Sequence, residues 1–169
     1  MTQLGIWAIQ FADEYPSAVV TGIDLSPIQP AFVPPNARFY VDDMEQPWGY
    51  QDDEKFDFIH WRSMCGTTGN WPRMYQQAYE NLKSGGWLEV QDYDGHIRSL
   101  DDPKSDKVPW LRDMFEQVRE TSSKLGKPVD IARFHKKWME EAGFVDVQER
   151  VISVRSTTQP RKRTVAGFY

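Results

Sequence analysis

The stretch that decides the fold is AVVTGIDL, at residues 18–25. The run before Asp24 is rich in β-branched side chains and contains no charged residue. This pattern predicts a strand that is buried on both faces, as strands of a parallel sheet are. Working outward along the chain, similar patterns predict further strands at residues 37–43, 56–64, 86–94 and 145–154.

Helical patterns stand between and around these strands. Apolar residues recur at helical spacing in segments 5–14, 109–125 and 130–142, and in the segment that follows Asn70. Asn70 is a good N-cap, and the pair Gly85-Gly86 is expected to end that helix. Strands that alternate with helices indicate an α/β fold, with a mostly parallel sheet and helices on both faces. We expect one domain at residues 1–154 and a basic tail at 155–169.

Composition excludes several classes of protein. The 169 residues carry 20 basic and 25 acidic side chains, a net charge of −5, which is unfavourable for a general nucleic-acid binder. No apolar run approaches the ~20 residues of a membrane span, and the first residues do not resemble a secretory signal. The lone Cys65 excludes a disulfide framework and a Cys-rich zinc site. We therefore expect a cytoplasmic protein without a metal site.

Polar side chains stand where the predicted strands end. Ligands of open parallel sheets bind outside the carboxyl ends of the strands. An acid at such an end, as Asp24 is, can accept hydrogen bonds from both hydroxyls of a ribose. Strand-end acids also occur simply as turn and cap residues. The strand-end groups in this chain are Asp24, Asp42-Asp43, His60-Trp61-Arg62 and Asp92-Tyr93-Asp94.

Four segments in uninterrupted order resemble class I S-adenosylmethionine-dependent methyltransferases, and most of all the methyltransferase-like proteins of secondary metabolism. They are GIWAIQFADEYPSAVVTGIDLSPIQP (5–30), NARFYVDDMEQPW (36–48), FDFIHWRSM (56–64) and NLKSGGWLEVQDYD (81–94). The resemblance implies a Rossmann-like fold and a small-molecule acceptor. It also implies cofactor-binding positions at Gly5, Asp24, Leu25, Asp42, Asp43 and Met44, and catalytic positions at His60 and Arg62. Asp24 matches the ribose acid, Asp43 the adenine side, and His60 is a candidate base.

The chain departs from the family at its start. The family has a central first strand and a glycine-rich loop, of which only Gly5 remains here. We expect an N-terminally truncated domain that binds S-adenosylmethionine weakly, because several cofactor hydrogen bonds are lost. The two strands that flank the missing one must hide their edges. Either strands 18–25 and 56–64 pair directly, or a second copy covers the gap, and we expect a homodimer.

Three functions follow from this reading. The first is methyl transfer from S-adenosylmethionine to a small molecule, with His60 as a base. The second is a repurposed enzyme that isomerises or cyclises an apolar metabolite without the cofactor. The third is a non-catalytic protein that acts through protein partners. Among the other residues, His60 could form an acid–base pair with Asp92 or Asp94. We expect Cys65 to be a packing or spectator residue. His96 and His135 have no evident partner in the sequence, and we expect them to be surface or structural residues.

Overall fold

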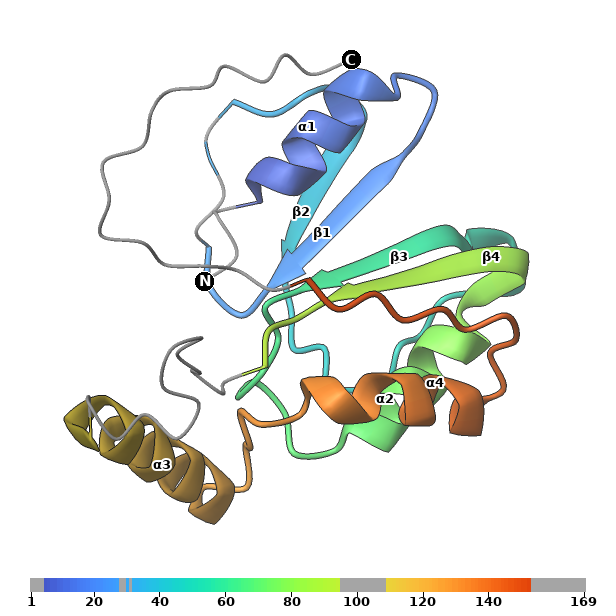
Figure 1. Ribbon diagram of the computed structural model, residues 1–169. Coiled ribbons are helices and arrows are strands. Elements are labelled where there is room, and N and C mark those ends of the chain that lie inside the picture. Colours follow the sequence, from blue (N-terminus) through green and yellow to red (C-terminus); the bar gives the residue numbers. More distant parts are fainter. Residues whose placement is uncertain (1–4, 28–29, 31, 95–108, 153–169) are drawn as a thin grey trace.

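The computed structural model describes the chain except for residues 1–4, 28–29, 31, 95–108 and 153–169. Helices and strands alternate through most of it, as the sequence predicts (Figure 1). In chain order the elements are α1 (Ile6–Glu14), β1 (Val20–Asp24), β2 (Ala37–Val41), the 3-10 helix η1 (Asp52–Glu54), β3 (Phe56–Arg62), α2 (Trp71–Glu80), β4 (Leu82–Gln91), α3 (Pro109–Lys124), the 3-10 helix η2 (Ala132–Phe134) and α4 (His135–Ala142).

The described strands pair in parallel, in two separate sheets. β1 pairs with β2, and Asp24 lies opposite Val41 at the end of the register. β3 pairs with β4, and Arg62 lies opposite Gln91. The parallel α/β architecture is therefore confirmed, but the described strands do not form one continuous sheet. β1 and β3 do not pair directly, so one of the two expected solutions for the missing strand is wrong for this structure.

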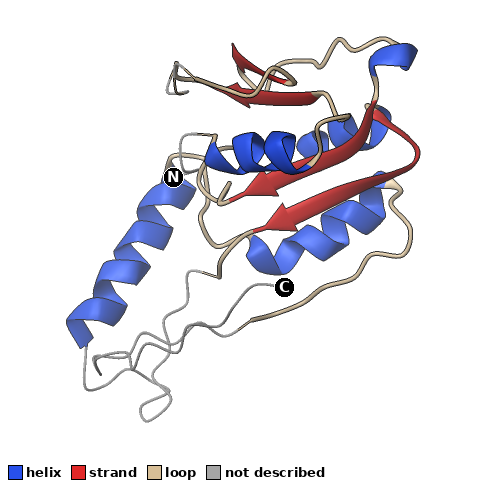
Figure 2. Ribbon diagram, turned by 90° about the horizontal axis from the view of Figure 1, so that it is seen from above, coloured by secondary structure: helices blue, strands red, loops and turns tan. Residues whose placement is uncertain are grey.

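The alternation of side chains along β3 explains how helices come to lie on both faces of the second sheet. Ile59 and Trp61 point into the main core, where Trp71, Met74 and Tyr75 of α2 are almost completely buried. Phe58 and His60 point the other way, toward α1. Figure 2 shows helices on both sides of the strands. Each large side chain buried in this core contributes about 1.5–3 kcal/mol of stability.

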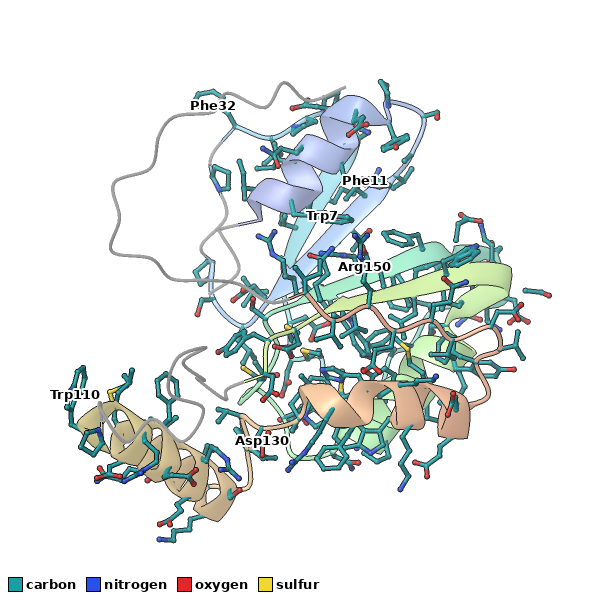
Figure 3. The ribbon with its side chains drawn as sticks, viewed as in Figure 1. Trp7, Phe11, Phe32, Trp110, Asp130 and Arg150 are labelled. Carbon is teal, nitrogen blue, oxygen red and sulfur yellow. The ribbon has the colours of Figure 1, made fainter. Side chains whose placement is uncertain are left out.

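Helix α1 belongs to the first sheet but also reaches the second. Its Ala12 is buried with Val20 and Ala37 of the two strands beneath it. From the same helix, Trp7 and Phe11 extend toward β3, where the Phe11 ring lies 6.0 Å from that of Phe58 (Figure 3). These aromatic contacts are the direct link between α1 and the strand pair that it does not cover.

Two predicted element boundaries are wrong. Helix α2 ends at Glu80 rather than at the glycine pair, because the Asn81 N–H and side chain both bond back to the Gln77 carbonyl. Gly85 and Gly86 instead lie inside β4, where the ladder with β3 is irregular. The strand begins at Leu82, earlier than predicted.

The predicted strand at 145–154 is absent from the residues described there, 145–152. Val145, Val151 and Ile152 are strongly exposed, and the segment has no neighbouring strand to pair with. An alternating sequence forms a strand only where its backbone finds a hydrogen-bonding edge. The expected tail at 155–169 lies outside the described residues.

No helix in the described part of the chain is long and apolar enough to cross a membrane. Within the same residues, no group of three or more His, Cys, Asp or Glu side chains is placed to hold a metal ion.

Candidate functional site

One of the predicted site residues, Asp24, lies at the carboxyl end of β1. Asp24 is the last residue of the strand, and its Oδ1 accepts the Ser26 N–H at 2.9 Å. Its backbone carbonyl accepts the Asp42 N–H at 3.0 Å, which joins the ends of β1 and β2. Among the described residues, Asp24 Oδ2 has no hydrogen-bond partner. One oxygen therefore fixes the carboxylate while the other stays able to accept.

Asp42 and Asp43, at the end of β2, lie beside Asp24 and belong to the same candidate site. Asp42 Oδ1 accepts the Asp43 N–H at 2.8 Å. The carboxylate of Asp43 is occupied by the following turn, since Oδ1 accepts the Glu45 N–H at 2.9 Å and Oδ2 the Gln46 amide at 3.3 Å. These hydrogen bonds, first that of Glu45, favour the ionised form and lower the pKa of Asp43. Asp43 thus shapes the loop with its side chain, whereas Asp42 is exposed.

Met44 follows β2 and is packed against the core, whereas Leu25 follows β1 and is exposed. Met44 packs against the main core, and its carbonyl accepts the Trp48 indole N–H at 3.0 Å. Leu25 is exposed immediately after β1. An exposed apolar side chain beside the Asp24 carboxylate is suited to contact the flat face of a bound base.

Gly5 lies just before α1 and has φ of 75°, a backbone conformation that L side chains rarely adopt. A Cβ at this position would lie 2.8 Å from the Phe39 ring of β2. Both facts require glycine there. The local backbone and the Phe39 ring therefore explain why residue 5 is a glycine. The role of Gly5 in cofactor binding stays a prediction.

His60 occupies a different setting from the exposed strand ends. Its side chain is only 6% exposed, and its Nδ1 lies 2.9 Å from Glu89 Oε2 on β4. The Trp7 indole stacks on the imidazole, with ring centroids 3.9 Å apart and planes 12° from parallel. The buried Nε2 has no hydrogen-bond partner in the described residues. A substrate reaches this nitrogen only if the side chains that bury it move.

Burial decides the protonation of His60. It lowers the pKa of the imidazole, and this effect outweighs the hydrogen bond to Glu89, which acts in the opposite direction. The nearby Arg62 also disfavours the charged form. His60 is therefore neutral near pH 7 and has the chemistry of a base, although it is covered.

The structure brings the predicted site residues into two groups. Asp24, Leu25, Asp42, Asp43 and Met44 lie together at the ends of β1 and β2. His60 and Arg62 lie near the end of β3, in the other sheet. All four strands end on the same side of the molecule (Figure 1), which is the arrangement that a crevice at the strand ends requires.

Glu89 was missed as the partner of His60, and the possible pair with Asp92 or Asp94 does not form in the structure. The register of the parallel pair sets His60 directly opposite Glu89. The predicted strand ends, at residues 64 and 94, gave no signal of this register.

A buried polar chain at the end of β4 was also missed. His135 Nδ1 lies 2.7 Å from the Tyr75 hydroxyl, and His135 Nε2 lies 3.4 Å from Asp92 Oδ2. Burial raises the pKa of Tyr75 far above its ordinary value, so this hydroxyl keeps its proton. The tautomer of His135 decides which of the two groups donates in their hydrogen bond. His135 is therefore a structural residue that joins α2, α4 and the end of β4, although its partners were not evident in the sequence. His96 lies outside the described residues.

Cys65 has the properties of a packing residue. It packs against the main core, and burial raises the pKa of its thiol, which disfavours the reactive thiolate.

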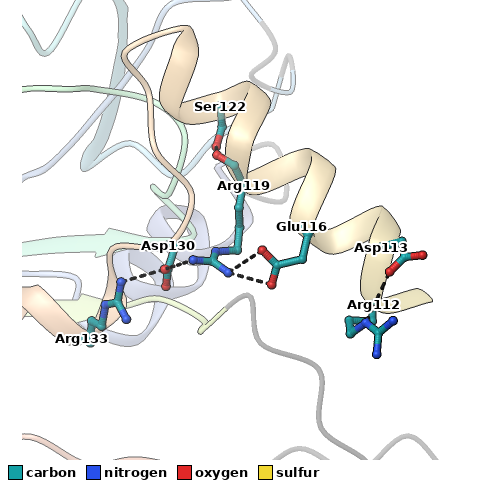
Figure 4. Close-up of polar contacts among 7 residues, drawn as sticks. All are labelled: Arg112, Asp113, Glu116, Arg119, Ser122, Asp130 and Arg133. Atoms are coloured by element: carbon teal, nitrogen blue, oxygen red, sulfur yellow. Dashed lines mark hydrogen bonds and ion pairs between the residues drawn. The ribbon is translucent and has the colours of Figure 1, made fainter. Parts of the chain in front are cut away.

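A cleft of about 550 Å³ lies between α3 and the segment that leads into α4. Its apolar wall is formed by Ile131, Phe134 and Trp138. On its polar side, Asp130 accepts from Arg133 at 2.9 Å and lies 3.3 Å from Arg119, which also bonds Glu116 (Figure 4). An apolar wall with a few fixed polar groups is typical of small-molecule pockets.

Comparison with known proteins identifies the family. A family model described as a methyltransferase domain matches residues 2–149. The chain belongs to this methyltransferase domain family. Its parallel strands and their covering helices are consistent with the Rossmann-like α/β fold of these enzymes. Chemistry that depends on S-adenosylmethionine is what this family membership generally implies.

Known relatives of this methyltransferase-domain chain come from fungi. It is 36% identical over 161 residues to methyltransferase pytC of Aspergillus terreus, covering 95% of this chain and 49% of that protein. It is 39% identical over 170 residues to the secondary metabolism regulator LAE1 of Cochliobolus heterostrophus, covering 98% and 55%. It is 34% identical over 170 residues to the protein-methionine methyltransferase laeA of Emericella nidulans, covering 98% and 45%.

The chain thus spans about half the length of the curated relatives that it matches. No solved structure matches it.

Proposed function

We propose that this methyltransferase-domain chain binds the nucleoside part of S-adenosylmethionine at the ends of β1 and β2. The observation that carries the proposal is the Asp24 carboxylate, fixed through Oδ1 by Ser26 and open at Oδ2. In this assignment Oδ2 accepts hydrogen bonds from the ribose, and the exposed Leu25 contacts the base. Asp42, Asp43 and Met44 line the adenine side, with Gly5 at the methionine side.

The methyl donor supplies an electrophilic methyl group, and the protein's own residues position the acceptor and hold its proton. We propose a small-molecule acceptor of secondary metabolism, because several relatives are named secondary metabolism regulators. His60 is the proposed base, because its neutral Nε2 has no partner, and Arg62 is the proposed orienting cation. The side chains that bury Nε2 must then move before this nitrogen accepts a proton.

The proposal is tested by titrating the purified chain with S-adenosylhomocysteine in a calorimeter. Asp24→Ala should weaken binding by about 1.5–3 kcal/mol, the usual scale of hydrogen bonds to a charged group, which corresponds to roughly 10–150-fold in Kd. Asp13→Ala, which removes an exposed carboxylate from α1, is the matched control and should change nothing. An unchanged Kd for Asp24→Ala removes the assignment.

A second candidate function is regulation through a protein partner, including methyl transfer to a protein. It is favoured by the names of the relatives that are described as regulators or as a protein-methionine methyltransferase. Incubation with a fungal extract and methyl-labelled S-adenosylmethionine separates the two candidates. Label in the small-molecule fraction supports the first, and label confined to protein supports the second.

We also propose that the chain is a cytoplasmic homodimer. The dimer is supported by the apolar side chains that the described residues leave exposed, and the location by the single cysteine, which is typical of a reducing compartment.

A further inference from the structure

The outer side of α3 carries a row of apolar side chains that the described residues do not cover. Trp110, Met114, Val118 and Leu125 are 67%, 45%, 46% and 75% exposed. The first three follow each other at intervals of four residues, so they lie on one side of the helix, and Leu125 continues the row just past its end. No residue of α3 is buried. We call these four residues the outer stripe.

The side of α3 next to this stripe faces the rest of the molecule. Arg119 reaches across to Asp130, and Leu111 and Phe115 on that side are half-buried. Figures 1 and 2 both show α3 at the edge of the molecule, away from the strands. The outer stripe is therefore turned outward and extends about 22 Å along the helix axis.

A helix of this length is marginal in water unless an apolar face is packed. Exposed apolar rows bordered by polar residues mark interaction surfaces in many soluble proteins. Asp113, Gln117 and Lys124 provide such a border here. The stripe therefore has the properties of a contact surface.

The charges of α3 distinguish between partners. The half of the helix before Gln117 has one arginine and two carboxylates, a net charge of −1. The half from Gln117 onward has Arg119, Glu120 and Lys124, a net charge of +1. A helix that lies on a lipid surface needs an excess of basic residues, which α3 lacks. Of these charges, Asp113 and Lys124 lie at the edge of the outer stripe. A second α3 in antiparallel orientation therefore brings Asp113 of one copy toward Lys124 of the other, and it also opposes the two helix dipoles.

We propose that the outer stripe packs antiparallel against the outer stripe of a second copy of this chain. Around a twofold axis near Met114 and Val118, the Trp110 side chain lies toward the Leu125 side chain of the other copy. This proposal rests on the homodimer proposed above and names its surface, and it is independent of cofactor binding. The gap between β1 and β3 is a less suitable surface, because Trp7 and Phe11 of α1 already extend toward β3.

The test compares two variants that introduce the same charge at exposed positions on opposite sides of α3. Light scattering at low micromolar concentration should give a mass of about twice 19.7 kDa for the wild type and for Ser123→Glu, but a single chain mass for Val118→Glu. A wild type that is monomeric overturns the proposal. A Val118→Glu chain that stays dimeric also overturns it.

A second measurement keeps the test valid if Val118→Glu perturbs folding. The fluorescence of Trp110, obtained as the difference between the wild type and Trp110→Phe, should shift to the red on dilution as the indole becomes exposed. No shift across the dilution at which the mass halves contradicts the proposed surface. The S-adenosylhomocysteine titration reports cofactor binding separately, so failure of the dimer and failure of the proposed function are distinguishable.

Discussion

At the scale of single residues, the His60 imidazole lies in an environment very different from water. Trp7 covers one face of the ring and Glu89 holds Nδ1. Burial lowers the pKa of His60 below its ordinary 6.5, so the unfolded chain binds this proton more readily than the folded chain does. The stability that neutral His60 contributes is fully present above that ordinary value and is lost as the pH falls through it toward the folded pKa.

We therefore expect the wild type to lose more stability than His60→Gln between about pH 7.5 and pH 5.5. Urea unfolding at both pH values measures the difference. Equal losses in the two proteins contradict the assignment of a lowered pKa to His60.

Sequence reasoning succeeded for single residues where the chemistry is local. Asp24 ends a strand whose apolar run is visible in the sequence, so its place followed from the pattern. The partners of His60 and His135 were not predictable in this way. They depend on the register of β3 against β4 and on the packing of α4 beside α2, which bring together residues 29 and 60 positions apart.

At the scale of elements, the ion-pair cluster at Asp130 attaches α3 to the segment before α4. The Asp130 carboxylate is 12% exposed and lies between the guanidinium groups of Arg119 and Arg133. Asp130→Ala should lower the free energy of unfolding by about 1–2 kcal/mol, because it leaves part-buried cations without this partner. Glu120→Ala removes an exposed carboxylate 3.8 Å from Lys124 and is the control, with an expected change below about 0.5 kcal/mol. Equal effects in thermal or urea unfolding refute a specific role for the cluster.

The elements that were predicted well are those whose signals are complete within the segment. Helix α3 has its apolar period, and α2 has its Asn70 cap, whose side chain accepts the Arg73 N–H. The prediction of a strand at 145–154 was wrong because a strand needs the free edge of a neighbouring strand to pair with, and the sequence of the segment does not show whether such an edge is present. The early start of β4 at Leu82 likewise reflects pairing with Phe56 across the sheet.

At the scale of the whole molecule, two parallel strand pairs are held together without a shared ladder. Two described links join them. The first is the aromatic contacts of α1 with β3, with the Trp7 ring 6.1 Å from that of Phe58. The second is the packing of Met44 and Trp48, which follow β2, against the main core. We expect Trp7→Ala to cost about 2 kcal/mol, less than a fully buried Trp, and to make urea unfolding less cooperative. Trp87→Ala, at an exposed position on β4, should change stability by less than about 0.5 kcal/mol. A fully cooperative Trp7→Ala transition with unchanged midpoint contradicts this link.

The central claim is that the ends of β1 and β2 form the nucleoside site of this methyltransferase domain. Its most direct test is an amide NMR titration of the isotope-labelled chain with S-adenosylhomocysteine. The account predicts saturable shift changes that are largest at residues 24–26 and 42–44, at the joined strand ends. Saturable changes confined to α3, α4 and the cleft between them, or no saturable change at all, would contradict it.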